Sequence, residues 1–181
     1  MLQHRFDSAL PFATFVERAQ ANAALWRAGH RLARVPDDAV ERLAALPGRW
    51  HLLVIVEDWC GDAVNTVPFL ARLAELAPNA DLRVVSRDEN PDLMGAHLTN
   101  GTRSIPVVMV LDEDYEEAGW WGPRPSALQQ WVTDEGMRLE QGERYRRVRT
   151  WYARDRGRTT ASEVIDVVAR AAARVGAPAA A

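Results

Sequence analysis

The sequence predicts an α/β fold, with a mixed sheet of about four strands that carries helices on both faces. Between residues 49 and 133, short aliphatic runs alternate with stretches of helical periodicity, which is typical of strands joined by covering helices. The run over 52–56 is apolar without alternation, as expected for a strand buried on both faces. The chain has 181 residues and is 48% hydrophobic, which suits a single domain over 1–181 with a sizeable core.

Helical extensions are expected on both sides of this core, over 1–48 and 134–181. Ser8 is suited to cap a first helix that ends at Gly29. Acidic residues after Pro36 then mark the start of a second, shorter helix. The two extensions are therefore expected to add helices to the α/β core.

The elements of the core, 49–133, follow from runs of apolar residues and from the turn residues between them. In chain order we expect a strand over 52–56, a helix over 61–77, a strand over 82–87, a short helix between Asn90 and Asn100, a strand over 106–112, a strand over 115–121 and a helix that begins at Ser126. This order describes a parallel βαβ unit followed by a hairpin and a covering helix.

Composition excludes several classes of protein. A single cysteine cannot close an intramolecular disulfide or build a cysteine-rich zinc site, and no metal-binding spacing of histidines occurs. A net charge of -3 argues against a nucleic-acid-binding surface, and no apolar run is long enough for a membrane span. The first residues lack a signal-peptide pattern, so we expect a cytoplasmic protein.

The single cysteine, Cys60, lies where the strand over 52–56 has ended and the next helix begins. Unpaired N–H groups and the helix dipole at such a position favour the thiolate, which is the nucleophilic form. The carboxylate of Asp62, with Glu57 and Asp58 nearby in sequence, opposes this effect. A small buried cysteine without chemistry is the alternative interpretation.

Four features around this position resemble the thioredoxin-like superfamily, and the resemblance covers about 49–133. They are the sequence Trp59-Cys60-Gly61, the helix proline Pro68, the loop Ser104-Ile105-Pro106 and the glycine Gly122. The wider set WCGD, RSIP and WGPRP is similar to a branch of bacterial thioredoxin-like proteins. The resemblance implies that Pro106 is a cis-proline lying against Cys60, and that the Ile105 backbone pairs with an extended substrate segment.

The resemblance also assigns roles to residues of this chain. Cys60 would be the nucleophile, and Asp62 would tune the thiol or transfer a proton. The residues expected to contact a substrate are Trp59, Gly61, Ala63, Ile105 and Pro106. Protein or peptide disulfides, or low-molecular-weight thiols, would be the partners.

One departure from the family pattern limits the chemistry. Ala63 stands where the family has its second, resolving cysteine, and Val54 stands where it has a buried acid. Because no other cysteine exists in the chain, we expect a monothiol route in which an external thiol, such as glutathione, resolves the mixed disulfide. Arg103 would contact that thiol, or would be an ordinary surface arginine, and no tightly bound cofactor is expected.

Two other functions are compatible with the sequence. The chain could be a redox-inactive module that binds peptides or proteins, with Cys60 as a remnant, or its thiol could sense peroxide. An arginine-rich stretch, 144–158, holds seven arginines and one acid. It is interpreted as a helix with a charged outer face rather than as an anion-binding surface.

Overall fold

The computed structural model describes residues 2–175. Residues 176–181, the end of the predicted C-terminal helical extension, lie outside the described part of the chain. The strands are β1 (Leu10–Pro11), β2 (Trp50–Val56), β3 (Ala80–Ser86), β4 (Val107–Leu111) and β5 (Glu117–Trp121). The helices are α1 (Leu2–Ser8), α2 (Phe12–Arg18), α3 (Ala23–Leu32), α4 (Asp37–Ala44), α5 (Gly61–Leu76), α6 (Pro91–Ala96), α7 (Ser126–Asp134), the 3-10 turn η1 (Gly136–Arg138), α8 (Gln141–Asp155) and α9 (Arg158–Val175).

The strands form one mixed sheet in the order β1-β3-β2-β4-β5. Strands β2 and β3 are parallel, whereas the pairs β2/β4, β4/β5 and β1/β3 are antiparallel. Every residue of the central strand β2 is buried, as expected from its unbroken apolar sequence. The predicted mixed α/β sheet is therefore confirmed, and its edge carries one short strand, β1, that the sequence did not indicate.

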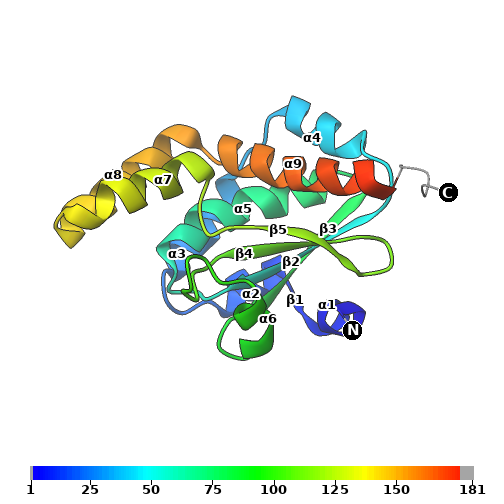
Figure 1. The fold of residues 1–181 in the computed structure, drawn as a ribbon, viewed down its shortest axis with the longest axis horizontal. Coiled ribbons are helices and arrows are strands. Elements are labelled where there is room, and N and C mark those ends of the chain that lie inside the picture. Colours follow the sequence, from blue (N-terminus) through cyan, green and yellow to red (C-terminus); the bar gives the residue numbers. More distant parts are fainter. Residues whose placement is uncertain (1, 176–181) are drawn as a thin grey trace.

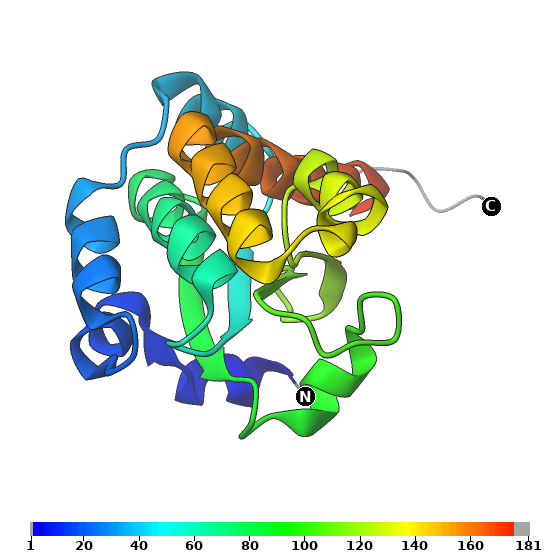
Figure 2. The same ribbon diagram turned by 90° about the vertical axis from the view of Figure 1, so that its left-hand side faces the viewer.

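Helices cover both faces of this sheet. Figure 1 shows α4, α5 and α9 above the sheet and α1, α2 and α6 below it, and Figure 2 gives the view from the side. One continuous hydrophobic core joins the sheet to the helices on its two faces. None of the helices described here is both long enough and apolar enough to cross a membrane.

The N-terminal extension differs from the single long helix expected between Ser8 and Gly29. A proline disfavours the helical conformation of the residue before it, which here is Leu10. The chain at Leu10–Pro11 is accordingly extended and pairs with β3. A second break lies at Asn22, which has a φ of 52° between α2 and α3. The expected helix is therefore replaced by α1, β1, α2 and α3.

Gly29 lies inside α3 and does not end it, contrary to the expectation from sequence. A Cβ atom at Gly29 would lie 2.9 Å from the Cγ atom of Pro68, which is too close for an ordinary contact. Pro68 lies inside α5, where its ring occupies the space that the glycine leaves open. The glycine therefore serves the close packing of α3 on α5.

The C-terminal extension divides into two parts. Helix α9 packs on β5, α4 and α5, whereas α7 and α8 reach beyond the end of the sheet as a two-helix arm (Figure 1). The arm has a small apolar cluster of its own around Leu128, Val132 and Tyr152. The turn between α8 and α9 passes over α5 at Gly157, whose φ is 75° and where a Cβ atom would collide with the ring of Phe69.

Candidate functional site

Cys60 is the N-cap residue of α5 and is separated from the end of β2 by three residues. Its Sγ atom accepts a hydrogen bond from the Ala63 amide at 3.4 Å and donates one to the Ile105 carbonyl oxygen at 3.3 Å. The side chain is buried, with 6% of the residue exposed. The cysteine therefore lies between the start of α5 and the loop before β4, as the sequence indicated.

The environment of Cys60 favours the thiol over the thiolate. Burial raises the pKa of the Cys60 thiol to about 11, and the charge of Asp62 adds to the increase. The hydrogen bond from the Ala63 amide and the positive charge of Arg124 act in the opposite direction but are smaller. The helix N-terminus thus fails to produce the low-pKa thiol that its position suggested, because removal of the sulfur from water is the larger effect.

Asp62 is held by two side chains that lie far from it in the sequence. The Tyr152 hydroxyl donates to Asp62 Oδ1 at 2.9 Å, and an Arg124 guanidinium nitrogen lies 2.6 Å from Asp62 Oδ2. A second nitrogen of Arg124 donates to Gln129 Oε1 at 2.9 Å. Burial is the main cause that raises the pKa of Tyr152, so its hydroxyl stays protonated and donates at neutral pH. The one carboxyl group of the WCGD sequence is therefore held by a hydrogen bond and an ion pair.

Gly122 lies against the loop that carries Pro106. Its φ is 140°, and a Cβ atom there would lie 2.2 Å from the Pro106 carbonyl oxygen, so this position admits only glycine without rearrangement. The peptide bonds Ile105–Pro106 and Gly122–Pro123 are both cis. The RSIP and WGPRP sequences thus meet beside Cys60. The second of them contains Arg124, the arginine that pairs with Asp62.

The loop before Cys60 is tied to the N-terminal extension through Asp58. The Asp58 carboxylate accepts hydrogen bonds from the backbone amides of Gln20 and Ala21 at 2.8 and 3.0 Å. Its carbonyl oxygen accepts from the indole nitrogen of Trp26, which is fully buried, at 2.8 Å. These bonds connect the α2–α3 segment to the loop before Cys60, so the N-terminal extension helps to hold that loop in place.

An exposed aromatic surface lies next to the buried thiol. Trp59 is 50% exposed, and the Arg87 guanidinium lies over its ring at 4.9 Å from the centroid. Arg103 is also exposed; it donates to the Arg87 carbonyl oxygen at 3.4 Å and lies 3.9 Å from Asp88. Trp59, Arg87 and Arg103 therefore lie on one face at this end of the sheet.

The residues predicted to contact a substrate differ in their accessibility. Trp59 and Gly61 are exposed, and the position of a Cβ atom at Gly61 has open space around it. The side chains of Ala63, Ile105 and Pro106 are buried, and Ala63 and Ile105 contact the sulfur atom through backbone groups. The structure brings Cys60, Ala63 and Ile105 together through the two hydrogen bonds of the sulfur atom.

Sequence reasoning did not assign a role to Arg124 or Tyr152. Arg124 was visible within WGPRP, and its charge next to a glycine-proline pair was the available signal. Tyr152 lies in the arginine-rich stretch, where nothing in the local pattern indicates a contact with Asp62, 90 positions away. Within residues 2–175, no group of three or more His, Cys, Asp or Glu side chains is placed to hold a metal ion.

Comparison with known proteins identifies the family to which the chain belongs. A family described as Thioredoxin matches residues 9–138. No curated protein matches the sequence.

Two solved structures resemble most of the chain. One is an HIV epitope scaffold, with 25% identity and a TM-score of 0.70 over 92% of this chain and 96% of the scaffold. The other is a protein of unknown function from Pseudomonas aeruginosa, with 27% identity and a TM-score of 0.70 over 90% of this chain and 93% of that protein. Both similarities extend beyond residues 9–138, so the helical extensions belong to the shared architecture.

Proposed function

Since the chain belongs to the thioredoxin family, we propose that it takes part in thiol–disulfide exchange through the single thiol of Cys60. The observation that carries the proposal is the contact between Cys60 Sγ and the Ile105 carbonyl oxygen, at 3.3 Å. An extended substrate that pairs with the backbone of this loop would bring its disulfide to the sulfur atom. Open space beside Gly61 and the exposed ring of Trp59 offer an approach to the same place.

The proposed exchange has two steps. The Cys60 thiolate attacks one sulfur of a protein or peptide disulfide, forms a mixed disulfide and releases the other substrate sulfur as a thiolate. An external thiolate, from glutathione or another low-molecular-weight thiol, then attacks the substrate sulfur of the mixed disulfide and releases Cys60. Ala63 cannot perform the second step, so the external thiol is a co-reactant. Such a thiol is abundant in the reducing cytoplasm, which is the location we propose.

The pKa of about 11 limits the rate of the first step. At pH 7 only about one Cys60 in ten thousand is a thiolate, and the thiolate is the reactive form. Exchange is therefore slow at neutral pH unless a bound substrate changes the surroundings of the sulfur atom. Peroxide sensing is disfavoured by the same burial, because oxidation also requires an accessible thiolate.

The experiment is incubation of the reduced protein with oxidised glutathione and with a disulfide-bonded peptide, followed by intact-mass analysis. An adduct that a Cys60→Ser variant does not form supports the proposal, and its removal by reduced glutathione completes the cycle. The absence of any adduct from the folded protein, at all pH values up to about 10, would refute it. An Ala63→Cys variant that reduces insulin disulfides would support the competence of the scaffold.

A second candidate function is favoured by the same burial of the sulfur atom. In this case the chain would be a redox-inactive module that binds a peptide or protein. Cys60 is buried and protonated, whereas Trp59 is half exposed, with the Arg87 guanidinium over its ring, and would contact the partner. In that case Cys60→Ser leaves binding of the partner unchanged, whereas Trp59→Ala weakens it. Loss of binding in the serine variant alone would exclude this candidate.

A further inference from the structure

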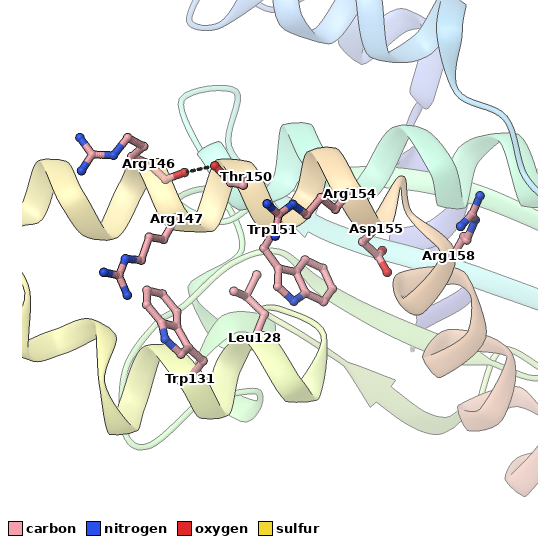
Figure 3. A pocket seen from close by; sticks show the side chains of 9 residues that line it. All are labelled: Leu128, Trp131, Arg146, Arg147, Thr150, Trp151, Arg154, Asp155 and Arg158. Carbon is pink, nitrogen blue, oxygen red and sulfur yellow. Dashed lines mark hydrogen bonds between the residues drawn. The ribbon is translucent and has the colours of Figure 1, made fainter.

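A groove of about 670 Å³ lies on the two-helix arm, outside the Cys60 site. It is lined by Leu128, Trp131, Arg146, Arg147, Thr150, Trp151, Arg154, Asp155 and Arg158. Figure 3 shows Trp131 on α7 and Trp151 on α8, with Leu128 between the two rings. The groove therefore has an apolar floor that is built mainly from two indole groups.

The edges of this groove are basic. Four of the seven arginines of the stretch 144–158 line it, against one lining carboxylate, Asp155. Asp155, the last residue of α8, contacts the Thr159 hydroxyl and accepts a bond from the Thr159 amide at 3.2 Å, so its charge is partly satisfied by the first turn of α9. A local excess of positive charge in a chain of net charge -3 favours an anion as the ligand of this groove.

The arginines that line the groove differ in whether their charge is already paired with a carboxylate. Arg146 and Arg147 both pair with Glu143 one turn earlier, and the Arg147 bond measures 2.8 Å. Arg154 and Arg158 form no ion pair with any other residue between 2 and 175. In Figure 3, Arg147 extends from α8 toward α7, and Arg154 lies along α8. The guanidinium group of Arg147 is thus directed toward the helix that carries Trp131.

We propose that this groove binds a nucleoside phosphate, an anion that carries a planar aromatic base. The flat faces of Trp131 and Trp151 suit stacking with an aromatic ring, and arginine forks suit the paired oxygens of phosphate groups. The volume lies within the range of roughly 300–1,000 Å³ that small-molecule pockets occupy, which favours a small ligand over an extended acidic peptide. This assignment is independent of the chemistry at Cys60.

The experiment uses the full chain with ATP, AMP, adenosine and inorganic tripolyphosphate as probes. Binding is followed by calorimetry and by quenching of tryptophan fluorescence. We expect ATP to bind more tightly than AMP, and both to bind at least about tenfold more tightly than adenosine or tripolyphosphate, because ring and charge both contribute. Added salt should weaken binding of the nucleotides, since exposed charges are screened.

Variants locate the binding in the groove. Arg147→Ala and Arg154→Ala should each weaken ATP binding by about tenfold, because each removes a charge-assisted bond. Arg149→Ala is the matched control: Arg149 is an exposed arginine of the same helix that does not line the groove, and its removal should change affinity by less than about twofold. All three positions are exposed, so unfolding by heat should confirm that the variants fold alike.

Several outcomes would overturn the assignment. They are the absence of nucleotide binding, equal effects of the Arg149 and Arg154 substitutions, and tripolyphosphate binding as tight as that of ATP. Tighter binding of an acidic peptide than of ATP would also overturn it in favour of a protein partner. Because Cys60→Ser leaves the groove intact, nucleotide binding by that variant separates this test from the test of thiol exchange.

Discussion

The Tyr152 hydroxyl donates a hydrogen bond to Asp62 across 90 positions of the chain, at 2.9 Å. Tyr152 belongs to α8 of the two-helix arm, and Asp62 lies in the first turn of α5, two residues after Cys60. Arg124 holds the other oxygen of the same carboxylate at 2.6 Å. The C-terminal extension is thus linked, through one carboxyl group, to the helix turn that follows Cys60.

Tyr152→Phe should lower the free energy of unfolding by about 1–2 kcal/mol. The ring keeps its place in the apolar cluster of the arm, but the buried bond to the Asp62 carboxylate is lost. Urea denaturation of the two proteins measures the difference. Tyr145→Phe is the control: its hydroxyl contacts Gln141 in an exposed position, and a loss above about 0.5 kcal/mol there would contradict this explanation.

Asp62→Asn should lower the pKa of Cys60 below about 11. The Asp62 charge raises that pKa and Arg124 lowers it, so removal of the carboxylate leaves only the favourable charge. The pKa should stay above that of an ordinary cysteine, because burial is the larger cause of the shift. Titration of the thiolate by ultraviolet absorbance measures both values. An exposed control, Asp38→Asn, should leave the titration unchanged, and an unaltered curve for Asp62→Asn would contradict the assigned role.

Gly122→Ala should destabilise the fold by about 3 kcal/mol or more. The φ of 140° strains any other residue, and the new Cβ atom would lie 2.2 Å from the Pro106 carbonyl oxygen. Gly95→Ala in α6 is the matched control, because a Cβ atom there has open space and helices favour alanine. Chemical denaturation should therefore show a loss at position 122 and no loss at position 95. Equal stability of both variants would contradict the close approach of Gly122 to Pro106.

His97 should make stability depend on pH. Its Nε2 atom lies 2.9 Å from Glu117 Oε1 and its Nδ1 atom 2.6 Å from the Leu93 carbonyl oxygen, so both ring nitrogens face acceptors. The bond to Glu117 is the main cause that raises the pKa of His97 in the folded protein. The stabilisation is therefore complete below the unfolded pKa of about 6.5 and is lost as the pH rises through the folded value.

A His97→Gln variant should lack this loss. Denaturation of both proteins at pH values between about 6 and 9 should show the wild type losing its advantage as the pH increases. A constant difference between the two proteins across that interval would show that folding does not raise the pKa of His97. The result would leave the conclusions on Cys60 unchanged, because His97 links α6 to β5 and is no part of the sulfur's surroundings.

Much of the fold could be predicted because the core elements have strong local patterns. The apolar run of β2, the helix after Cys60 and the hairpin of β4 and β5 each follow from their own residues. The N-terminal helices were less predictable, since the break at Pro11 competes with a helical pattern on both sides. Strand β1 has two residues and exists only because β3 offers a free edge, which no local sequence pattern reports.

The candidate site was predictable in position and less so in chemistry. Cys60 could be placed at the start of a helix, where backbone amides favour the thiolate, and the Ala63 amide does contact the sulfur. The extent of burial depends on the whole packing of α5, β4 and their loops, and it outweighs the effect of the helix N-terminus on the pKa of Cys60. Arg124 and Tyr152 reach Asp62 through tertiary contacts, so their roles could not be inferred from spacing along the chain.

The thiol chemistry of Cys60 is tested most directly by the pH dependence of its reaction with oxidised glutathione, followed by intact mass. A nucleophile with a pKa of about 11 should react about tenfold faster for each unit of pH, without levelling between about pH 7 and 10. Cys60→Ser should form no adduct under the same conditions. A rate that levels near pH 8.5, or a folded protein that forms no adduct at any pH in this interval, would contradict exchange through a buried, protonated thiol.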